Sequence, residues 1–433
     1  MSENEVFEVP STSGPLNFSV TIPGSKSLTN RALLIAALGN QVTTLSNVLF
    51  SDDSKHFMDS LVKLGFKVEV DETRRLVSIR GQGGKIPNRQ GEIYVGSAGT
   101  AARFLTAMLA LSKGRYLVQA SPQMTARPMK PLLDPLTQLG VDFNFLQNSD
   151  SLPYSLHGNG FKGGHVTINA SQSSQFLSAL LLVGCYGEQD LVITLDGDLA
   201  ARPYIEMTIQ MMADFGVEVV NRDFQHFEVP CGQMYHGMNY AIEPDASNAG
   251  YFLAMAVLSG GSALVQGVHL DSLQGDIKFV EALKQLGSRV EEHPEGLWLQ
   301  GPAGGVFPGI DIDMGGMPDQ TMTLAALAPF ATSTMNIRNI SLIKYHESNR
   351  VEAIIHELAR LGIHAEETET GIKIEPGTPV AAEIETYDDH RMAMAFSLIG
   401  LRVPGVRIKN PGCTAKTFGD YFERFRKAVE QRI

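Results

Sequence analysis

Two sequence patterns recur in phase along the chain, and this periodicity restricts the fold to an assembly of repeated units. The first pattern is an amphipathic helix that ends in Leu-Gly or Phe-Gly and is followed by a strand-like stretch. Its glycines lie 71 to 76 residues apart: Gly65, Gly140, Gly216, Gly287 and Gly362. Each is predicted to end its helix in the left-handed conformation, which glycine adopts most easily.

The second pattern is a helix that begins with small or polar residues and continues with Ala, Leu, Met and Phe. Its equivalent positions lie 70 to 76 residues apart: Leu34, Leu105, Leu177, Leu253, Leu324 and Met394. These helices are apolar on nearly all sides, so they are expected inside the molecule. The two patterns together predict a βαβαββ unit that occurs six times. The sixth unit is shortened, and its last helix is expected around Tyr421 to Glu430.

Six units predict two α/β domains of three units each. The first domain is expected to span residues 24–243, and the second residues 1–23 together with 244–433. The two crossover segments, near 22–25 and 242–245, have a turn-like composition. An open solenoid is the structural alternative, but the polar capping units that solenoids need are not found in the sequence.

Composition excludes several classes of function. The formal net charge of -12 argues against nucleic acid or an anionic membrane surface as a partner. The three cysteines, Cys185, Cys231 and Cys413, form no CxxC pair, so neither a disulfide framework nor a metal site is expected. The N-terminal residues lack an apolar core, which predicts no signal peptide, and no apolar run reaches the roughly 20 residues of a membrane span. These features predict a cytoplasmic protein.

The starts of the apolar helices carry residue types that cap helices or bind anions. Ordinary capping explains any single start, but the basic residues near these starts favour anion binding. Those residues are Lys26, Arg31, Arg103, Arg127, Arg350, Arg391 and Lys416. The helix starts themselves are Ser27, Thr29 and Asn30; Ser97, Gly99 and Thr100; Ser173 and Ser174; Asp245 and Ser247; Asp319; and Asp388 and Asp389.

Arginines within apolar helices require partners, because an unpaired buried charge is costly. Ion pairs with Asp52, Asp53 or Asp389 would satisfy them, and so would the phosphate and carboxylate groups of ligands. Two acids also lie among these cations. Asp319 and Glu347 would stay ionised there and accept a proton from a hydroxyl. Helix capping and an ion pair with Arg350 are their respective structural alternatives.

The motifs together resemble those of the EPSP synthase family of enolpyruvyl transferases, and the resemblance covers essentially the whole chain. The segments that carry it, in family order, are PGSKSLTNRALLIAAL, SAGTAARF, MTARP, SSQFLSALL, RPYI, MPDQTM, HESNR, DDHRMAMAFSL and NPGCTAKTFGDYF. The resemblance implies two inverse α/β domains, each of three βαβαββ repeats, which agrees with the repeat count.

The resemblance also implies an activity. The enolpyruvyl group of phosphoenolpyruvate would move to the 5-hydroxyl of shikimate 3-phosphate with release of phosphate, a step of aromatic amino acid biosynthesis through the shikimate pathway. Family members work without a metal or an organic cofactor and resemble monomers, so the same is expected of this chain.

The family motifs assign roles to individual residues. Proton transfer would involve Lys26, Asp319 and Glu347, with the division of acid and base roles left open. Phosphoenolpyruvate would contact Lys26, Gly99, Arg127, Gln175, Arg350, Arg391 and Lys416. The acceptor would contact Lys26, Ser27, Arg31, Ser173, Ser174, Gln175, Tyr204, Asp319 and His346.

Four positions depart from the family pattern: Ser97, Ala201, Leu342 and His346. The last three would lie on the acceptor side, where they replace a hydroxyl, an amide and a lysine. Arg202, Lys344 or a protonated His346 would compensate; alternatively, the acceptor is a different cyclic hydroxy acid, including one without a phosphate. An inactive anion-binding homologue is a further alternative. The related UDP-N-acetylglucosamine enolpyruvyl transferases carry a cysteine in the loop that corresponds to Ser121 to Lys130, and this loop has none.

Overall fold

The computed structural model describes residues 5–430, which belong to two compact units. Unit 1 consists of Met1–Pro23 and Pro244–Ile433, and unit 2 consists of Gly24–Glu243. The strands of the described residues form six small sheets, three in each unit. Each sheet belongs to one of the repeats predicted from the sequence.

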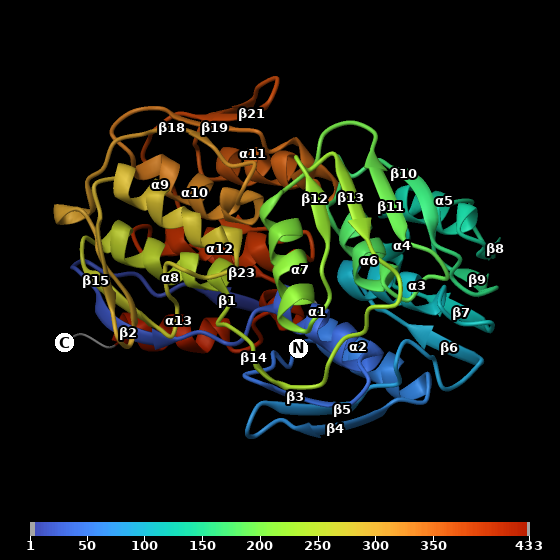
Figure 1. Ribbon diagram of the computed structural model, residues 1–433. Coiled ribbons are helices and arrows are strands. Elements are labelled where there is room, and N and C mark those ends of the chain that lie inside the picture. Colours follow the sequence, from blue (N-terminus) through green and yellow to red (C-terminus); the bar gives the residue numbers. More distant parts are fainter. Residues whose placement is uncertain (1–4, 431–433) are drawn as a thin grey trace. The chain divides into compact units, whose positions relative to one another are not determined.

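Unit 2 contains the first three repeats (Figure 1). The first is built from α1 (Lys26–Leu38), β3 (Val42–Ser46), α2 (Asp52–Lys63), β4 (Lys67–Asp71) and β5 (Leu76–Arg80). The second is built from β6 (Gln90–Tyr94), α3 (Gly99–Leu109), β7 (Arg115–Gln119), α4 (Pro122–Thr125), α5 (Lys130–Gln138), β8 (Asp142–Phe145) and β9 (Tyr154–His157). The third is built from β10 (Gly164–Ile168), α6 (Gln175–Gly184), β11 (Leu191–Leu195), α7 (Pro203–Asp214), β12 (Val220–Arg222) and β13 (His226–Val229).

Unit 1 contains the other three repeats. The fourth is built from β2 (Asn17–Thr21), α8 (Ala246–Ser259), β15 (Ser262–Gln266), α9 (Phe279–Gln285), β16 (Arg289–His293) and β17 (Gly296–Gln300). The fifth is built from β18 (Asp311–Asp313), α10 (Thr321–Leu327), β19 (Met335–Arg338), α11 (Arg350–Arg360), β20 (Ala365–Glu367) and β21 (Gly371–Ile374). The sixth is built from β22 (Glu383–Ile384), α12 (His390–Gly400), β23 (Arg407–Lys409) and α13 (Tyr421–Glu430).

The sheets share one topology. In the second repeat β6 pairs parallel with β7, β7 antiparallel with β9, and β9 antiparallel with β8. The sixth repeat lacks the closing hairpin, and β1 (Val6–Glu8) instead pairs antiparallel with β23. The predicted βαβαββ order and the shortened sixth unit are therefore confirmed.

The first strands of two repeats are exchanged along the chain. β2 directly precedes α1 in sequence, yet it pairs parallel with β15 of the fourth repeat. Likewise β14 (Asn239–Ala241) precedes α8 but pairs parallel with β3 of the first repeat. Gly24 lies where the chain passes from unit 1 into unit 2, and its backbone closely approaches that of Asn47. A Cβ at this position would lie 1.9 Å from the carbonyl oxygen of Asn47. Only glycine fits this position.

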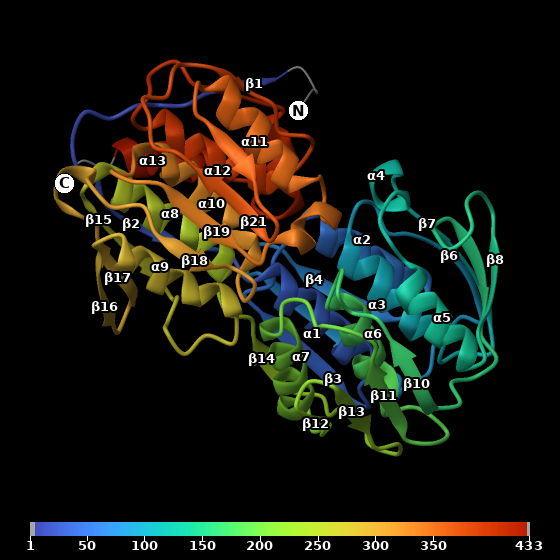
Figure 2. The same cartoon turned by 90° about the horizontal axis from the view of Figure 1, so that it is seen from above.

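The apolar helices form the cores. In unit 2, α3 packs against both α1 and α6, and in unit 1, α8, α10 and α12 pack against one another (Figures 1 and 2). Every residue of α3 and α12 is buried. The helix-ending glycines all have the predicted left-handed backbone, with φ between 79° and 103°. The interior position of these helices is thus confirmed.

Residues 5–430 contain neither a membrane-spanning helix nor a cluster of metal-ligating side chains. None of the helices in this range has the length and apolarity required to cross a bilayer. Within the same range, no group of three or more His, Cys, Asp or Glu side chains is arranged to hold a metal ion.

At Gly287 the requirement for a left-handed backbone conformation can be tested separately from side-chain packing. Its φ is 88°, and an added Cβ would meet only Pro302 at an ordinary 3.6 Å. Gly287→Ala is therefore expected to lower the free energy of unfolding by about 1 kcal/mol through backbone strain alone. Urea denaturation measures this. Gly14→Ala, in open space without a left-handed φ, is the control and should change stability by less than about 0.5 kcal/mol. Equal stability of both variants would contradict the prediction.

Candidate functional site

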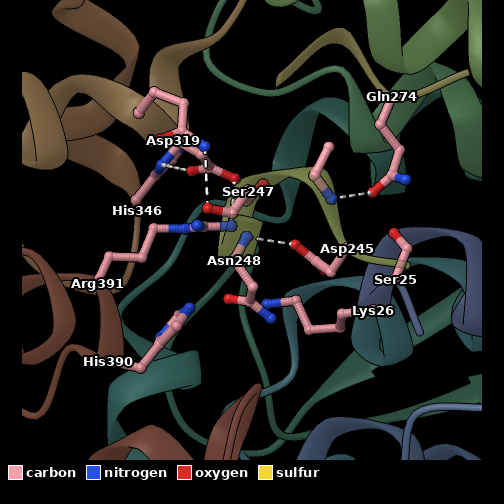
Figure 3. Close-up of polar contacts among 12 residues, drawn as sticks. Ser25, Lys26, Asp245, Ser247, Asn248, Gln274, Asp319, His346, His390 and Arg391 are labelled. Atoms are coloured by element: carbon pink, nitrogen blue, oxygen red, sulfur yellow. Dashed lines mark hydrogen bonds and ion pairs between the residues drawn. The ribbon is translucent and has the colours of Figure 1, made fainter. Parts of the chain in front are cut away.

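The helix starts of unit 1 are only partly explained by capping. Asp245 accepts a hydrogen bond from the Asn248 backbone N–H at 2.9 Å and so caps α8 (Figure 3). Asp389 caps α12 by accepting from the Arg391 N–H at 3.0 Å. Asp319 lies within a short 3-10 turn ahead of α10 and contacts arginines. The N-cap of α10 is Gln320, so Asp319 does not occupy the cap position.

Unit 2 requires two corrections at its helix starts. α1 begins at Lys26 with Ser25 as its N-cap, so Ser27 lies within the first turn rather than at the cap. Ser174 precedes α6 without a capping bond; the Ser173 hydroxyl instead accepts from the Gln175 backbone N–H at 3.3 Å. Residue type alone therefore misplaced these two caps.

The central feature of unit 1 is the guanidinium of Arg350, whose side chain is 1% exposed. Its nitrogens lie 2.9 Å from Asp319, 2.9 Å from Glu347 and 2.8 Å from Asp389. A buried arginine is stable only when such charge-assisted hydrogen bonds replace its hydration. The ion pair expected between Glu347 and Arg350 is present.

Two further cations extend this cluster. Asp319 uses one carboxylate oxygen for Arg350 and the other for Arg391, at 2.8 Å. Glu347 similarly uses one oxygen for Arg350 and the other for Lys416, at 3.3 Å. The order Lys416, Glu347, Arg350, Asp319, Arg391 therefore alternates in sign. Arginine and lysine side chains of this kind match the anionic groups of ligands.

These contacts shift the pKa values of the cluster. Burial acts to raise the pKa of the Asp319 carboxyl, but the positive charges of Arg391, Arg350 and His346 outweigh it and hold the pKa well below its ordinary value. Burial likewise acts against the charged form of Arg350, yet the carboxylates of Asp389, Glu347 and Asp319 raise its pKa above the ordinary value. At neutral pH both groups are charged.

Neighbours of the cluster fix its geometry. The Nδ1 atom of His346 lies 2.8 Å from Arg350 and 3.8 Å from Asp319 (Figure 3). The Tyr251 hydroxyl accepts from Arg391 at 3.3 Å, and burial raises the pKa of Tyr251 to about 12, so it stays protonated. Tyr251 was not foreseen from the sequence; a tyrosine inside an apolar helix, whose hydroxyl needs a partner, was the available signal.

In unit 2, two of the expected donor-side residues begin helices: Lys26 begins α1 and Gly99 begins α3. Lys26 is 3.5 Å from Asp53, one of the acids considered as a partner. The guanidinium of Arg127 lies so near Gly99 that a Cβ there would be 2.8 Å from its Nη1 atom. Gly99 thus leaves room for the arginine.

Arg31 is fully buried, and its guanidinium donates hydrogen bonds to neutral groups. It donates to the Thr208 hydroxyl at 2.8 Å, to the Ser178 hydroxyl at 3.3 Å, and to the backbone oxygens of Ser27 and Tyr204. Burial lowers the pKa of Arg31 to about 10. Ser178 and Thr208 were not identified from sequence, because hydroxyls inside apolar helices usually bond their own backbone.

Arg103, on α3, contacts the first residue of α6 and the segment that precedes α5. It donates to the side-chain oxygen of Gln175 at 2.6 Å and to the Pro128 carbonyl at 2.9 Å. Its guanidinium also lies 4.7 Å from the centroid of the Phe176 ring. Gln175, an expected ligand residue, is therefore oriented by an arginine to which the family motifs assigned no role.

The structure shows the surroundings of two departing residues, Leu342 and Ala201, and of two basic residues considered as compensation, Lys344 and Arg202. Leu342 is partly buried against the unit 1 core, and Lys344 pairs with Glu367 on the surface. Ala201 is buried with a φ of 48°. Arg202 lies over the ring of Phe224, 5.5 Å from its centroid.

Comparisons with known proteins agree over almost the full length. The family described as EPSP synthase (3-phosphoshikimate 1-carboxyvinyltransferase) matches residues 10–425. The 3-phosphoshikimate 1-carboxyvinyltransferase of Nostoc punctiforme is 45% identical over 427 residues, which cover 99% of this chain and 100% of that protein. That of Trichormus variabilis is 46% identical over 428 residues, with the same coverage. The solved EPSP synthase of Acinetobacter baumannii has a TM-score of 0.81 at 24% identity, over 98% of both chains. This likeness confirms the predicted fold class.

The low pKa of Asp319 leads to a prediction about stability. A carboxyl with a lowered folded-state pKa stabilises the protein fully above its unfolded pKa of about 4, and this contribution is lost as pH falls further. The difference in unfolding free energy between wild type and Asp319→Asn should thus be constant from pH 8 to about 5 and shrink below about pH 4. Urea denaturation across this range measures the difference. A difference that grows on acidification would contradict the prediction.

Proposed function

Because this chain belongs to the EPSP synthase family, we propose that it transfers the enolpyruvyl group of phosphoenolpyruvate to the 5-hydroxyl of shikimate 3-phosphate and releases phosphate. The observation that carries the proposal is the family match over residues 10–425, which includes every residue considered for catalysis. The chain is accordingly an enzyme of the shikimate pathway. The cytoplasmic location and monomeric state expected from sequence remain part of this proposal.

The cations of each unit supply the binding groups. In unit 1, Arg350, Arg391 and Lys416 are proposed to hold the anionic groups of phosphoenolpyruvate. In unit 2, Lys26, Gly99, Arg127 and Gln175 are proposed for the same ligand. The acceptor is assigned to Lys26, Ser27, Arg31, Ser173, Ser174, Gln175, Tyr204, Asp319 and His346. Phosphate and carboxylate groups match such donors in charge and in hydrogen-bond geometry.

The reaction requires two proton transfers at phosphoenolpyruvate. A proton adds to its methylene carbon, the acceptor hydroxyl loses its proton and attacks the adjacent carbon, and a tetrahedral ketal phosphate forms. Loss of a proton from the new methyl group and departure of phosphate then restore the enol ether. Lys26, Asp319 and Glu347 are proposed for these transfers, because each is a titratable group among the cations.

Substrate binding is expected to raise the pKa of the Asp319 carboxyl. In the structure its pKa is lowered by neighbouring positive charges, which makes the carboxylate a weak base. Anionic substrates near Arg391 and Arg350 oppose that positive field. Binding would therefore raise the pKa of Asp319 and strengthen it as a proton acceptor when the hydroxyl is present.

Several relatives between 40% and 46% identical carry the name 3-phosphoshikimate 1-carboxyvinyltransferase, and no comparison favours the altered acceptor or the inactive homologue. The local accounts of Leu342 and Lys344 also require no change of acceptor. His346, which stands where the family has a lysine, still places a ring nitrogen beside Asp319 and Arg350.

Phosphate release tests the activity directly. The wild-type enzyme is expected to release phosphate from phosphoenolpyruvate with shikimate 3-phosphate, and much more slowly with unphosphorylated shikimate. Lys26→Met should lower kcat at least about 100-fold, since a positioned acid or base contributes at least this much. The result that would sink the proposal is no release with shikimate 3-phosphate; release with shikimate alone would instead indicate the altered acceptor.

The spacing between Gly99 and Arg127 gives a prediction specific to the donor. The Cβ of Gly99→Ala would displace the far end of a flexible side chain, so the fold should tolerate it while the guanidinium moves. We expect the KM for phosphoenolpyruvate to rise at least about 10-fold with an unchanged Tm. Gly91→Ala, whose Cβ would make only ordinary contacts at 3.6 Å and beyond, is the matched control. An unchanged KM in Gly99→Ala would contradict the assignment of Arg127.

A further inference from the structure

Glu357 is a buried carboxylate outside the cluster around Arg350. It lies on α11, and its side chain is 0% exposed. One oxygen accepts from the backbone N–H of Glu385 at 3.0 Å, and the other accepts from the Tyr387 hydroxyl at 2.7 Å. Arg360, which is 57% exposed, lies 3.2 Å from the same carboxylate. Glu357 therefore holds the segment 385–387 at two points.

The segment held by Glu357 continues into a tight turn. Tyr387 and Asp388 have φ values of 55° and 51°, so two consecutive residues with side chains adopt the left-handed conformation. This conformation is unfavourable for residues that carry a Cβ, and it persists only where the surroundings impose it. Asp389 closes the turn by donating its backbone N–H to the Thr386 carbonyl at 2.8 Å.

The turn delivers two residues to the charged cluster. The Asp389 carboxylate accepts from the Nε atom of Arg350 at 2.8 Å, and it also caps α12 through the Arg391 N–H. The side chain of Arg391 then reaches Asp319. A shift of the turn would move Asp389 and the first residues of α12 together.

Helix α11 thus contacts the segment 385–389 twice. Glu357 and Arg350 are seven residues apart, so they lie on the same face of the helix. Glu357 holds the beginning of the segment, and Arg350 holds its end. Hydrogen bonds to a fully buried carboxylate are strong, and loss of its partners leaves a costly unpaired charge, so this contact resists displacement.

We propose that Glu357 is a positioning residue for the donor site: through the turn at Tyr387 and Asp388 it sets the places of Asp389 and Arg391. The proposal rests on the proposed function, in which Arg391 holds phosphoenolpyruvate. A purely structural role is the alternative. A well-packed apolar side chain would fill that role at least as well as a buried carboxylate does.

Substitutions that remove the two contacts separately test the proposal. Glu357→Leu removes both contacts and keeps an apolar side chain of similar size. Tyr387→Phe removes only the phenol contact and keeps the backbone contact, so it remains informative if Glu357→Leu does not fold. Glu357→Gln, which retains one acceptor oxygen, is the conservative variant. Glu366→Leu, at an exposed carboxylate of β20, is the control.

The first readout is the KM of each substrate, from phosphate release. Glu357→Leu should raise the KM for phosphoenolpyruvate at least about 10-fold, while the KM for shikimate 3-phosphate changes less than about 2-fold. Tyr387→Phe and Glu357→Gln should have intermediate values, and Glu366→Leu should match wild type. A lower Tm with both KM values unchanged would overturn the positioning role.

The second readout does not depend on turnover. Hydrogen exchange of the amides in residues 385–391 should be faster in Glu357→Leu and Tyr387→Phe than in wild type, because the turn loses its restraint. Unchanged exchange in both variants would overturn the proposal. If wild type releases no phosphate at all, the proposed function fails, and exchange alone then decides whether Glu357 positions the turn.

Discussion

The burial of Arg350 is the constraint on which the unit 1 site depends. A guanidinium that is 1% exposed cannot rely on water, so the chain must surround it with carboxylates. Asp319 and Asp389 come from two distant segments, and Glu347 lies in the turn just before α11, so the contacts with Asp319 and Asp389 fix those segments relative to α11. The ion pairs that compensate the buried charge of Arg350 therefore also hold the segments of the site together.

The arrangement explains how the proposed anion site is compatible with a net charge of -12. In the cluster around Arg350, three carboxylates balance three cations, so attraction does not arise from a large net charge. It arises from the order of the charges, because Asp319 and Glu347 each lie between Arg350 and a further cation, Arg391 or Lys416. Preorganised charges of this kind need little rearrangement when an anion binds.

The repeat, the helix-ending glycines and the basic residues could be predicted from sequence, because each leaves a local signal in residue type or spacing. The sequence also led us to expect residues 1–23 in the second domain, but the strands with which β2 and β14 pair could not be predicted, since pairing between distant segments has no such signal. Asp319 was expected among the cations. Its position inside the 3-10 turn before α10, rather than at the helix cap, could not be predicted from residue type. The neutral partners of Arg31 could not be predicted either, because Ser178 and Thr208 lie on α6 and α7, far from Arg31 in the sequence.

Arg31 and Arg350 show two different uses of a buried arginine. The carboxylates around Arg350 raise its pKa, so its charge is compensated within the protein. The hydroxyl and carbonyl partners of Arg31 satisfy its hydrogen bonds but not its charge, and burial lowers its pKa to about 10. An arginine of the second kind gains more from an incoming anion than one already paired with acids. This difference supports the proposed assignment of Arg31 to an anionic group of the acceptor, whereas Arg350, proposed to contact phosphoenolpyruvate, also holds the segments of the site together.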